Sequence, residues 1–161
     1  MNKKTLILGI GNYLLRDEGI GIHIIHILEK ERLPSHISLL DGGTSGLHLL
    51  SWLQDYERII LIDATLDNNP PGTIQLIYPH HAKDFPPLMS AHEIGLQDMI
   101  EAMILTEHLP EIQLITISVQ NINDIGLDLT PSIKASIPKV IHLIKQLVDD
   151  KSHKKKLSTV K

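Results

Sequence analysis

Short apolar runs alternate along the chain with segments in which apolar residues recur at helical spacing. Four mainly apolar runs predict buried strands, at residues 6–8, 37–40, 59–62 and 112–119. Apolar residues three and four positions apart predict helices over residues 20–28, 47–53, 96–104 and 133–147. Residues 73–78 alternate more weakly and follow a turn-rich connection without a crossover helix, so we expect an antiparallel edge strand there. This order predicts an α/β fold: a three-layer α/β/α sandwich around a small, mostly parallel mixed sheet of about five strands.

Length and composition narrow the class of protein. A chain of 161 residues that is 42% hydrophobic suits one globular domain, which we place at residues 1–150. Residues 151–161 are basic and lack apolar periodicity, so we expect a disordered tail. The absence of cysteine excludes thiol nucleophiles and zinc–thiolate sites. The net charge of −4, without a basic face, argues against nucleic acid as a partner. No apolar run is long enough to span a membrane, and we therefore expect a cytoplasmic protein.

The stretch Thr5–Gly21 joins the first strand to the first helix. Gly9 and Gly11 allow a sharp turn after the strand, and Asp17 and Glu18 follow where the helix starts. Ligands bind at this position in open α/β sheets. Dinucleotide binding through the two glycines is one alternative, although Leu14 replaces the third glycine of that fingerprint and the two acids would repel a pyrophosphate. Capping of the helix is the structural alternative for both acids.

Two further acids end predicted strands, and one histidine begins a predicted helix. Asp41 precedes two glycines, where it serves equally well as a turn former or as a functional group. Asp63 follows four apolar residues, where an unpaired carboxylate is costly to bury, which favours a functional role. His92 falls in the first helical turn after Ser90, where the helix dipole keeps an imidazole neutral and able to bind metal.

The other histidines give weaker signals. His23 and His26 lie in the first helix without the i, i+4 spacing of a metal pair, so we expect them at the surface or its boundary. We expect the adjacent His80 and His81 to be exposed. If the first and third strands pair at the centre of the sheet, Glu18 and Asp63 lie together at the carboxyl edge of the sheet, which we call the rim. His92 would reach the same rim from the loop that precedes its helix. Such a donor set suits a divalent metal such as nickel, zinc or manganese.

Several segments together resemble the hydrogenase maturation proteases, endopeptidases that trim the C-terminus of the large subunit of nickel–iron hydrogenases. The resemblance spans residues 4–148, and the basic tail has no counterpart in it. The segments that carry it are Leu8–Gly21, Leu40–Thr44, Ile62–Ala64, Ser90–Leu96, Ile125–Leu127 and Leu129–Pro131. It implies a cytoplasmic α/β protease whose partner is the large-subunit precursor and whose recognition signal is the nickel that the precursor supplies. Matched motif by motif, the metal contacts fall on Glu18, Asp63 and His92, and Asp41 matches a further acidic position in the cleft.

The chemistry stays open at this point. Without a cysteine or a defensible serine triad, we expect a water molecule to hydrolyse the peptide, as in an aspartic-type endopeptidase, with Asp41, Glu18 and Asp63 as catalytic candidates. Either a metal held by Glu18, Asp63 and His92 activates carbonyl or water, or a carboxylate such as Asp41 acts as general base while the metal positions the substrate. Two other classes remain: a nucleotide- or small-molecule-binding enzyme, and a chaperone of the metal centre that cleaves nothing.

Overall fold

The computed structural model describes residues 2–44, 46–84, 91–106 and 108–150. The side chains of residues 46, 47, 82 and 91–97 lie outside that description. The predicted tail, residues 151–161, also lies outside it, so the division into one domain and a tail stays a prediction. Within the described residues, no helix is both long enough and apolar enough to cross a membrane.

Five strands form one mixed sheet in the order β2-β1-β3-β5-β4. The four parallel strands are β1 (Thr5–Gly9), β2 (Ile37–Asp41), β3 (Arg58–Thr65) and β5 (Glu111–Ser118). The edge strand β4 (Ile74–Ile77) is antiparallel to β5. The fold class predicted from the sequence is therefore confirmed, including the central pair of the first and third strands and the antiparallel edge strand.

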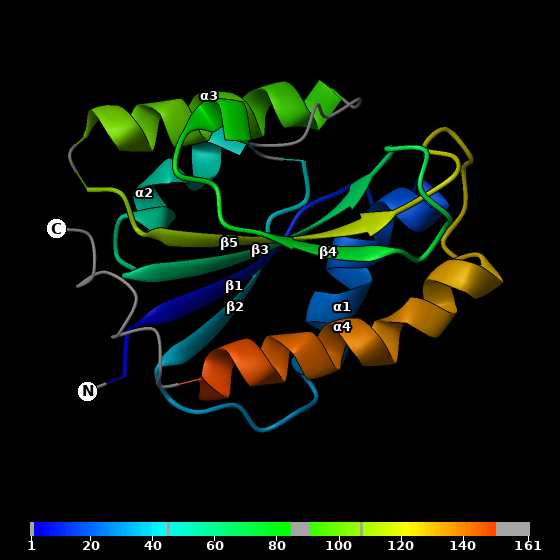
Figure 1. Ribbon diagram of the computed structural model, residues 1–161, viewed down its shortest axis with the longest axis horizontal. Coiled ribbons are helices and arrows are strands. Elements are labelled where there is room, and N and C mark those ends of the chain that lie inside the picture. The colour runs from blue at the N-terminus through cyan, green and yellow to red at the C-terminus, as the bar shows by residue number, and fades with distance from the viewer. Residues whose placement is uncertain (1, 45, 85–90, 107, 151–161) are drawn as a thin grey trace, which may run out of the picture.

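Helices cover both faces of the sheet (Figure 1). On one face α1 (Ile20–Leu28) and α4 (Pro131–Asp149) pack on the core cluster that contains Ile7, Ile60 and Ile115. On the other face α2 (Leu50–Leu53) and α3 (Ala91–Leu105) adjoin the cluster that contains Leu8, Leu61 and Leu114. The described residues also form three short 3₁₀ helices, η1 (Arg16–Gly19), η2 (Gly46–Leu49) and η3 (Ala82–Asp84).

The elements differ from the sequence pattern in three places. β3 continues through Thr65, so Asp63 lies inside a strand and not after its end. The helix predicted over residues 47–53 is shared between η2 and the single turn of α2. The acids Asp17 and Glu18 lie in η1, and α1 begins only at Ile20.

The start of α1 packs directly on the two central strands. A Cβ atom added to Gly21 would lie 2.5 Å from the carbonyl oxygen of Ile62 and 2.6 Å from that of Ile10. A Cβ atom on Gly9 would in turn overlap the carbonyl oxygen of Gly21. These glycines therefore allow backbone to approach backbone, and the space beside them is filled by the protein's own helix.

The close approach of α1 predicts the effect of a Gly21→Ala substitution. Intrinsic helix propensity alone would make alanine more stable by about 1 kcal/mol in a helix interior. The contacts with the carbonyl groups of Ile10 and Ile62 should reverse that sign and lower the free energy of unfolding by about 1–3 kcal/mol. Urea denaturation measures the difference, with Lys139→Ala at an exposed position of α4 as a control. A Gly21→Ala protein more stable than the wild type would contradict the packing argument.

Candidate active site

Glu18 and Asp63 lie on neighbouring elements at the carboxyl edge of the sheet. η1 packs against β3, and the Ile10 N–H donates to the Ile62 carbonyl at 3.0 Å. Gly11 has no Cβ that would overlap the Glu18 carbonyl oxygen. Glu18 is 3% exposed and Asp63 is 1% exposed. The sequence prediction that these two carboxylates share one rim therefore agrees with the structure, which also buries both of them.

His92, the third predicted metal ligand, is the second residue of α3, and its side chain lies outside the described residues. No group of three histidine, aspartate or glutamate side chains that could hold a metal occurs among the side chains that the structure describes. A carboxylate–carboxylate–imidazole set that includes His92 therefore stays a prediction. The two buried carboxylates provide hard oxygen donors, which suit manganese, and an imidazole such as that of His92 is a donor that suits nickel or zinc.

Asp41 and Asp63 project from opposite faces of the sheet. Gly9 pairs in register with Asp41 on one side and with Ile62 on the other, so Asp41 shares a face with Ile62. Asp63 is the next residue along β3, and side chains alternate between the faces of a strand. Asp41 therefore lies on the face covered by α1, whereas Asp63 lies on the face covered by α2 and α3. The sequence could not show this separation, because it depends on strand register.

Asp41 both forms a turn and contacts a histidine. One carboxylate oxygen accepts from the Gly43 N–H at 3.0 Å, which is the Asx turn that the sequence offered as an alternative. The other lies 3.2 Å from His26 Nε2. Both side chains remain more than two-fifths exposed, so solvent reaches this pair.

His23 and His26 form a half-buried aromatic cluster with Tyr13. The Tyr13 ring lies 4.7 Å from that of His23 and 5.4 Å from that of His26 between centroids. Burial, and then the charge of His26, lower the pKa of His23, so His23 stays neutral to a lower pH than a free imidazole. The position at the surface boundary agrees with the prediction, but the contact of His26 with Asp41 was not foreseen. The prediction that His80 and His81 are exposed is confirmed.

Asp17 connects two distant parts of the carboxyl rim. Its carboxylate accepts from the Thr130 N–H at 2.8 Å and from the Thr130 hydroxyl at 2.7 Å. Thr130 is the N-cap of α4, so Asp17 fixes the loop that precedes α4. Asp17 therefore has a structural role, but it holds the loop before α4 and does not cap α1, as the structural alternative had supposed.

Buried hydroxyl groups surround Asp63 on its face of the sheet. Thr116 pairs in register with Asp63, and Thr65 pairs with Ser118 in the next row of that face. These three residues are at most 3% exposed. The sequence analysis missed them, although polar residues alternating with isoleucine at the end of β5 were a signal that one side of the strand is polar.

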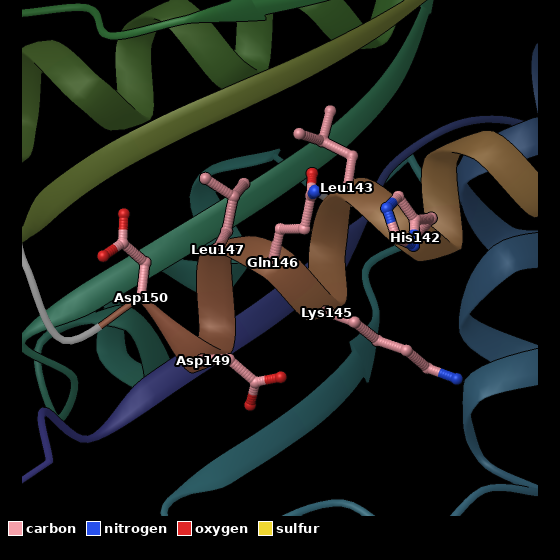
Figure 2. Close-up of a pocket in the computed structure, with 7 residues that line it drawn as sticks. All are labelled: His142, Leu143, Lys145, Gln146, Leu147, Asp149 and Asp150. Carbon is pink, nitrogen blue, oxygen red and sulfur yellow. The ribbon is translucent and has the colours of Figure 1, made fainter.

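A surface pocket of about 740 Å³ lies along the last turns of α4, far from these acids. In Figure 2, Leu147 points toward the sheet, whereas Lys145 and Asp149 point away from it. The pocket ends at Asp150. Burial lowers the pKa of Arg58, and the charges of the Glu111 and Asp150 carboxylates partly offset this lowering. Arg58 begins β3, so the pocket lies at the amino edge of the sheet and is separate from the candidate site.

The fold and the site together define an α/β enzyme with a buried acid pair at the carboxyl edge of its sheet. The glycines that suggested dinucleotide binding contact backbone of the same chain, which accounts for them without a phosphate ligand.

Comparison with known proteins identifies the family. The family model described as hydrogenase maturation protease matches residues 22–147. The hydrogenase 2 maturation protease of Escherichia coli is 32% identical over 145 residues, which cover 88% of each chain. The hydrogenase expression/formation protein HupD of Rhizobium leguminosarum is 33% identical and is matched over 86% of this chain and 70% of its own length. The chain therefore belongs to the hydrogenase maturation proteases and is an endopeptidase of that family.

Solved structures of similar proteins show the same fold. The hydrogenase maturating endopeptidase HybD from Escherichia coli has a TM-score of 0.81 and 32% identity, with 89% of this chain and 90% of that chain covered. The [NiFe] hydrogenase maturation protease HybD from Thermococcus kodakarensis has a TM-score of 0.74 and 30% identity, with 92% and 99% covered. The resemblance stated from the sequence motifs is thereby confirmed.

The contact between Asp17 and Thr130 predicts a stability change without a change in fold. Asp17→Ala should lower the free energy of unfolding by about 1–3 kcal/mol, because it leaves the partly buried Thr130 N–H without its acceptor. Combined with Thr130→Val, it should show a coupling energy of at least about 0.5 kcal/mol. Chemical denaturation of the four proteins of this cycle checks both values. Asp124→Ala, an exposed acid in the loop before α4, should change stability by less than about 0.5 kcal/mol.

Proposed function

We propose that this endopeptidase removes a C-terminal peptide from the precursor of a nickel–iron hydrogenase large subunit after nickel has been inserted. The family membership supports the reaction class, and the buried pair Glu18 and Asp63 at the carboxyl edge is the observation that carries the proposal. The enzyme acts in the cytoplasm on a protein partner, without nucleic acid or membrane as a ligand. The chain has no cysteine, and its serines form no triad that we can defend, so we assign the hydrolysis to a water molecule.

The nickel belongs to the substrate in this proposal, and other divalent metals would substitute for it. Glu18, Asp63 and His92 contact the metal that the precursor already carries and so hold the peptide beyond it in a fixed place. Holding the peptide in this way turns an encounter between two proteins into a positioned reaction, which lowers the entropic part of the barrier. Two carboxylates buried to 3% exposure or less have little water around them, so a cation that reaches them interacts strongly.

The hydrolytic step needs a base, and we assign this role to Asp41. A carboxylate takes a proton from water, the water oxygen attacks the carbonyl carbon, and the peptide C–N bond breaks as its nitrogen is protonated. Asp41 and Asp63 point to opposite faces of the sheet, but Asp41 is the last residue of β2 and therefore lies at the same carboxyl edge. Asp41 is partly exposed, and its turn adjoins the loop of Glu18, because the Gly11 N–H donates to the Gly43 carbonyl at 2.9 Å. His26, at 3.2 Å from the carboxylate, is positioned to accept that proton from Asp41 and to pass it on.

The nickel requirement can be tested with purified precursor in nickel-loaded and nickel-free forms. Mass spectrometry of the precursor should show loss of the C-terminal peptide from the loaded form alone. Glu18→Gln and Asp63→Asn should reduce cleavage by about 100-fold or more, because they remove the charge that binds the metal. Glu29→Gln, at an exposed position after α1, should cleave like the wild type. Equal cleavage of both forms would rule out nickel as the signal, and no cleavage of either would indicate a metal-centre chaperone.

The role of Asp41 can be separated from its turn by the Asp41→Asn substitution. Asparagine keeps the acceptor for the Gly43 N–H, so the melting temperature should change little. The loss of the base should lower kcat by about 100-fold or more while KM changes little. Asp55→Asn, an exposed acid near the amino edge of β3, serves as the control. Full activity of Asp41→Asn would restrict Asp41 to turn formation.

A further inference from the structure

Three exposed leucine and isoleucine side chains lie on two neighbouring loops at the carboxyl edge of the sheet. Leu14 is 62% exposed, Ile125 is 86% exposed and Leu127 is 52% exposed. Leu14 belongs to the loop between β1 and η1, whereas Ile125 and Leu127 belong to the loop between β5 and α4. We name these three residues the rim patch.

Backbone hydrogen bonds hold the two loops of the rim patch together. The Gly126 N–H donates to the Leu14 carbonyl, and the Arg16 N–H donates to the Gly126 carbonyl, both at 2.8 Å. Leu15 and Gly126 form a parallel bridge, which sets Leu14 beside Ile125. Leu127 lies two residues beyond Ile125, so the three residues belong to two loops that are hydrogen-bonded to each other.

The patch is fixed as well as exposed. Asp17 binds Thr130, which lies three residues after Leu127. Single exposed apolar side chains are common on soluble proteins, but a contiguous group marks an interaction surface. The Leu14 N–H donates to the Asn12 side chain and the Leu14 carbonyl accepts from the Gly126 N–H, so the backbone that carries Leu14 is held on both sides.

The rim patch is continuous with the site that must receive the substrate. Leu14 lies four residues before Glu18 in the same connection, and the loop of Ile125 and Leu127 follows β5. β3, which carries Asp63, lies between β1 and β5 in the sheet. The loops that carry the rim patch therefore follow the two strands that lie on either side of β3.

We propose that the rim patch binds an apolar segment of the hydrogenase precursor next to the peptide bond that is cut. This inference rests on the proposed function, since it names the surface through which the same site holds its protein substrate. The patch contributes binding energy away from the bond that breaks, so it affects the capture of the precursor more than the chemical step. Because the patch is aliphatic, we expect the segment of the precursor that binds it to expose aliphatic side chains.

Kinetics of precursor cleavage test the rim patch. In the full-length enzyme with nickel-loaded precursor, the double variant Leu14→Ser and Ile125→Ser should raise KM by about tenfold, since each loses burial of an aliphatic side chain. The kcat value and the melting temperature should stay close to those of the wild type. Leu105→Ser removes an equally exposed leucine, 84% exposed at the end of α3, and should leave KM unchanged. A KM of the double variant equal to that of Leu105→Ser would overturn the proposal.

A second measurement distinguishes the precursor from a second copy of this chain. A photoreactive residue at position 125 should crosslink to the precursor, and sedimentation of the enzyme alone should show no dimer that depends on Ile125. A dimer that Ile125→Ser dissociates, with cleavage unaffected, would assign the patch to self-association and overturn the proposal. If the wild type itself fails to cleave the nickel-loaded precursor but still crosslinks to it, the proposed function fails while the docking surface stands.

Discussion

The contact between the start of α1 and the two central strands is the constraint on which the rest of the rim depends. Gly21 lies against the carbonyl oxygens of Ile10 and Ile62, and Gly9 lies against Gly21. Any side chain at these positions would push α1 away from the sheet. Since η1 directly precedes α1, its place at the carboxyl edge is determined by the same contact, and Glu18 is carried there with it. Glycines that in other α/β proteins make room for a phosphate here make room for the protein's own helix.

The two adjacent acids of η1 show how local geometry separates two roles. A 3₁₀ helix has three residues per turn, so consecutive side chains point roughly 120° apart. Asp17 is directed to Thr130 and stabilises the loop before α4. Glu18 therefore points in another direction, and it is buried at the edge where β3 ends.

The fold could be predicted from the sequence because its strands and helices follow from the local order of apolar and polar residues. Apolar runs and helical spacing depend on neighbours within a few residues, and they gave the five strands, the antiparallel edge strand and the acids at the rim. The face on which Asp41 lies depends on the register of β1 with β2 and β3, which no local pattern contains. The partner of Asp17 lies 113 residues away, and the contact of His26 with Asp41 joins a helix to a strand end. Long-range hydrogen bonds of this kind require the folded structure.

The loop between β1 and η1 connects the segments around β3 before any substrate arrives. The Gly11 N–H donates to Gly43 after β2, Leu14 accepts from Gly126 after β5, and Asp17 binds Thr130 at the start of α4. Each bond is modest, but together they fix three strand ends relative to one another. A site that is already ordered loses little conformational freedom when a peptide binds, so more of the binding energy serves to position the bond that is cut. The hydrolysis by water proposed above needs this precise placement, because a water molecule and a base act only when the carbonyl group is held within their reach.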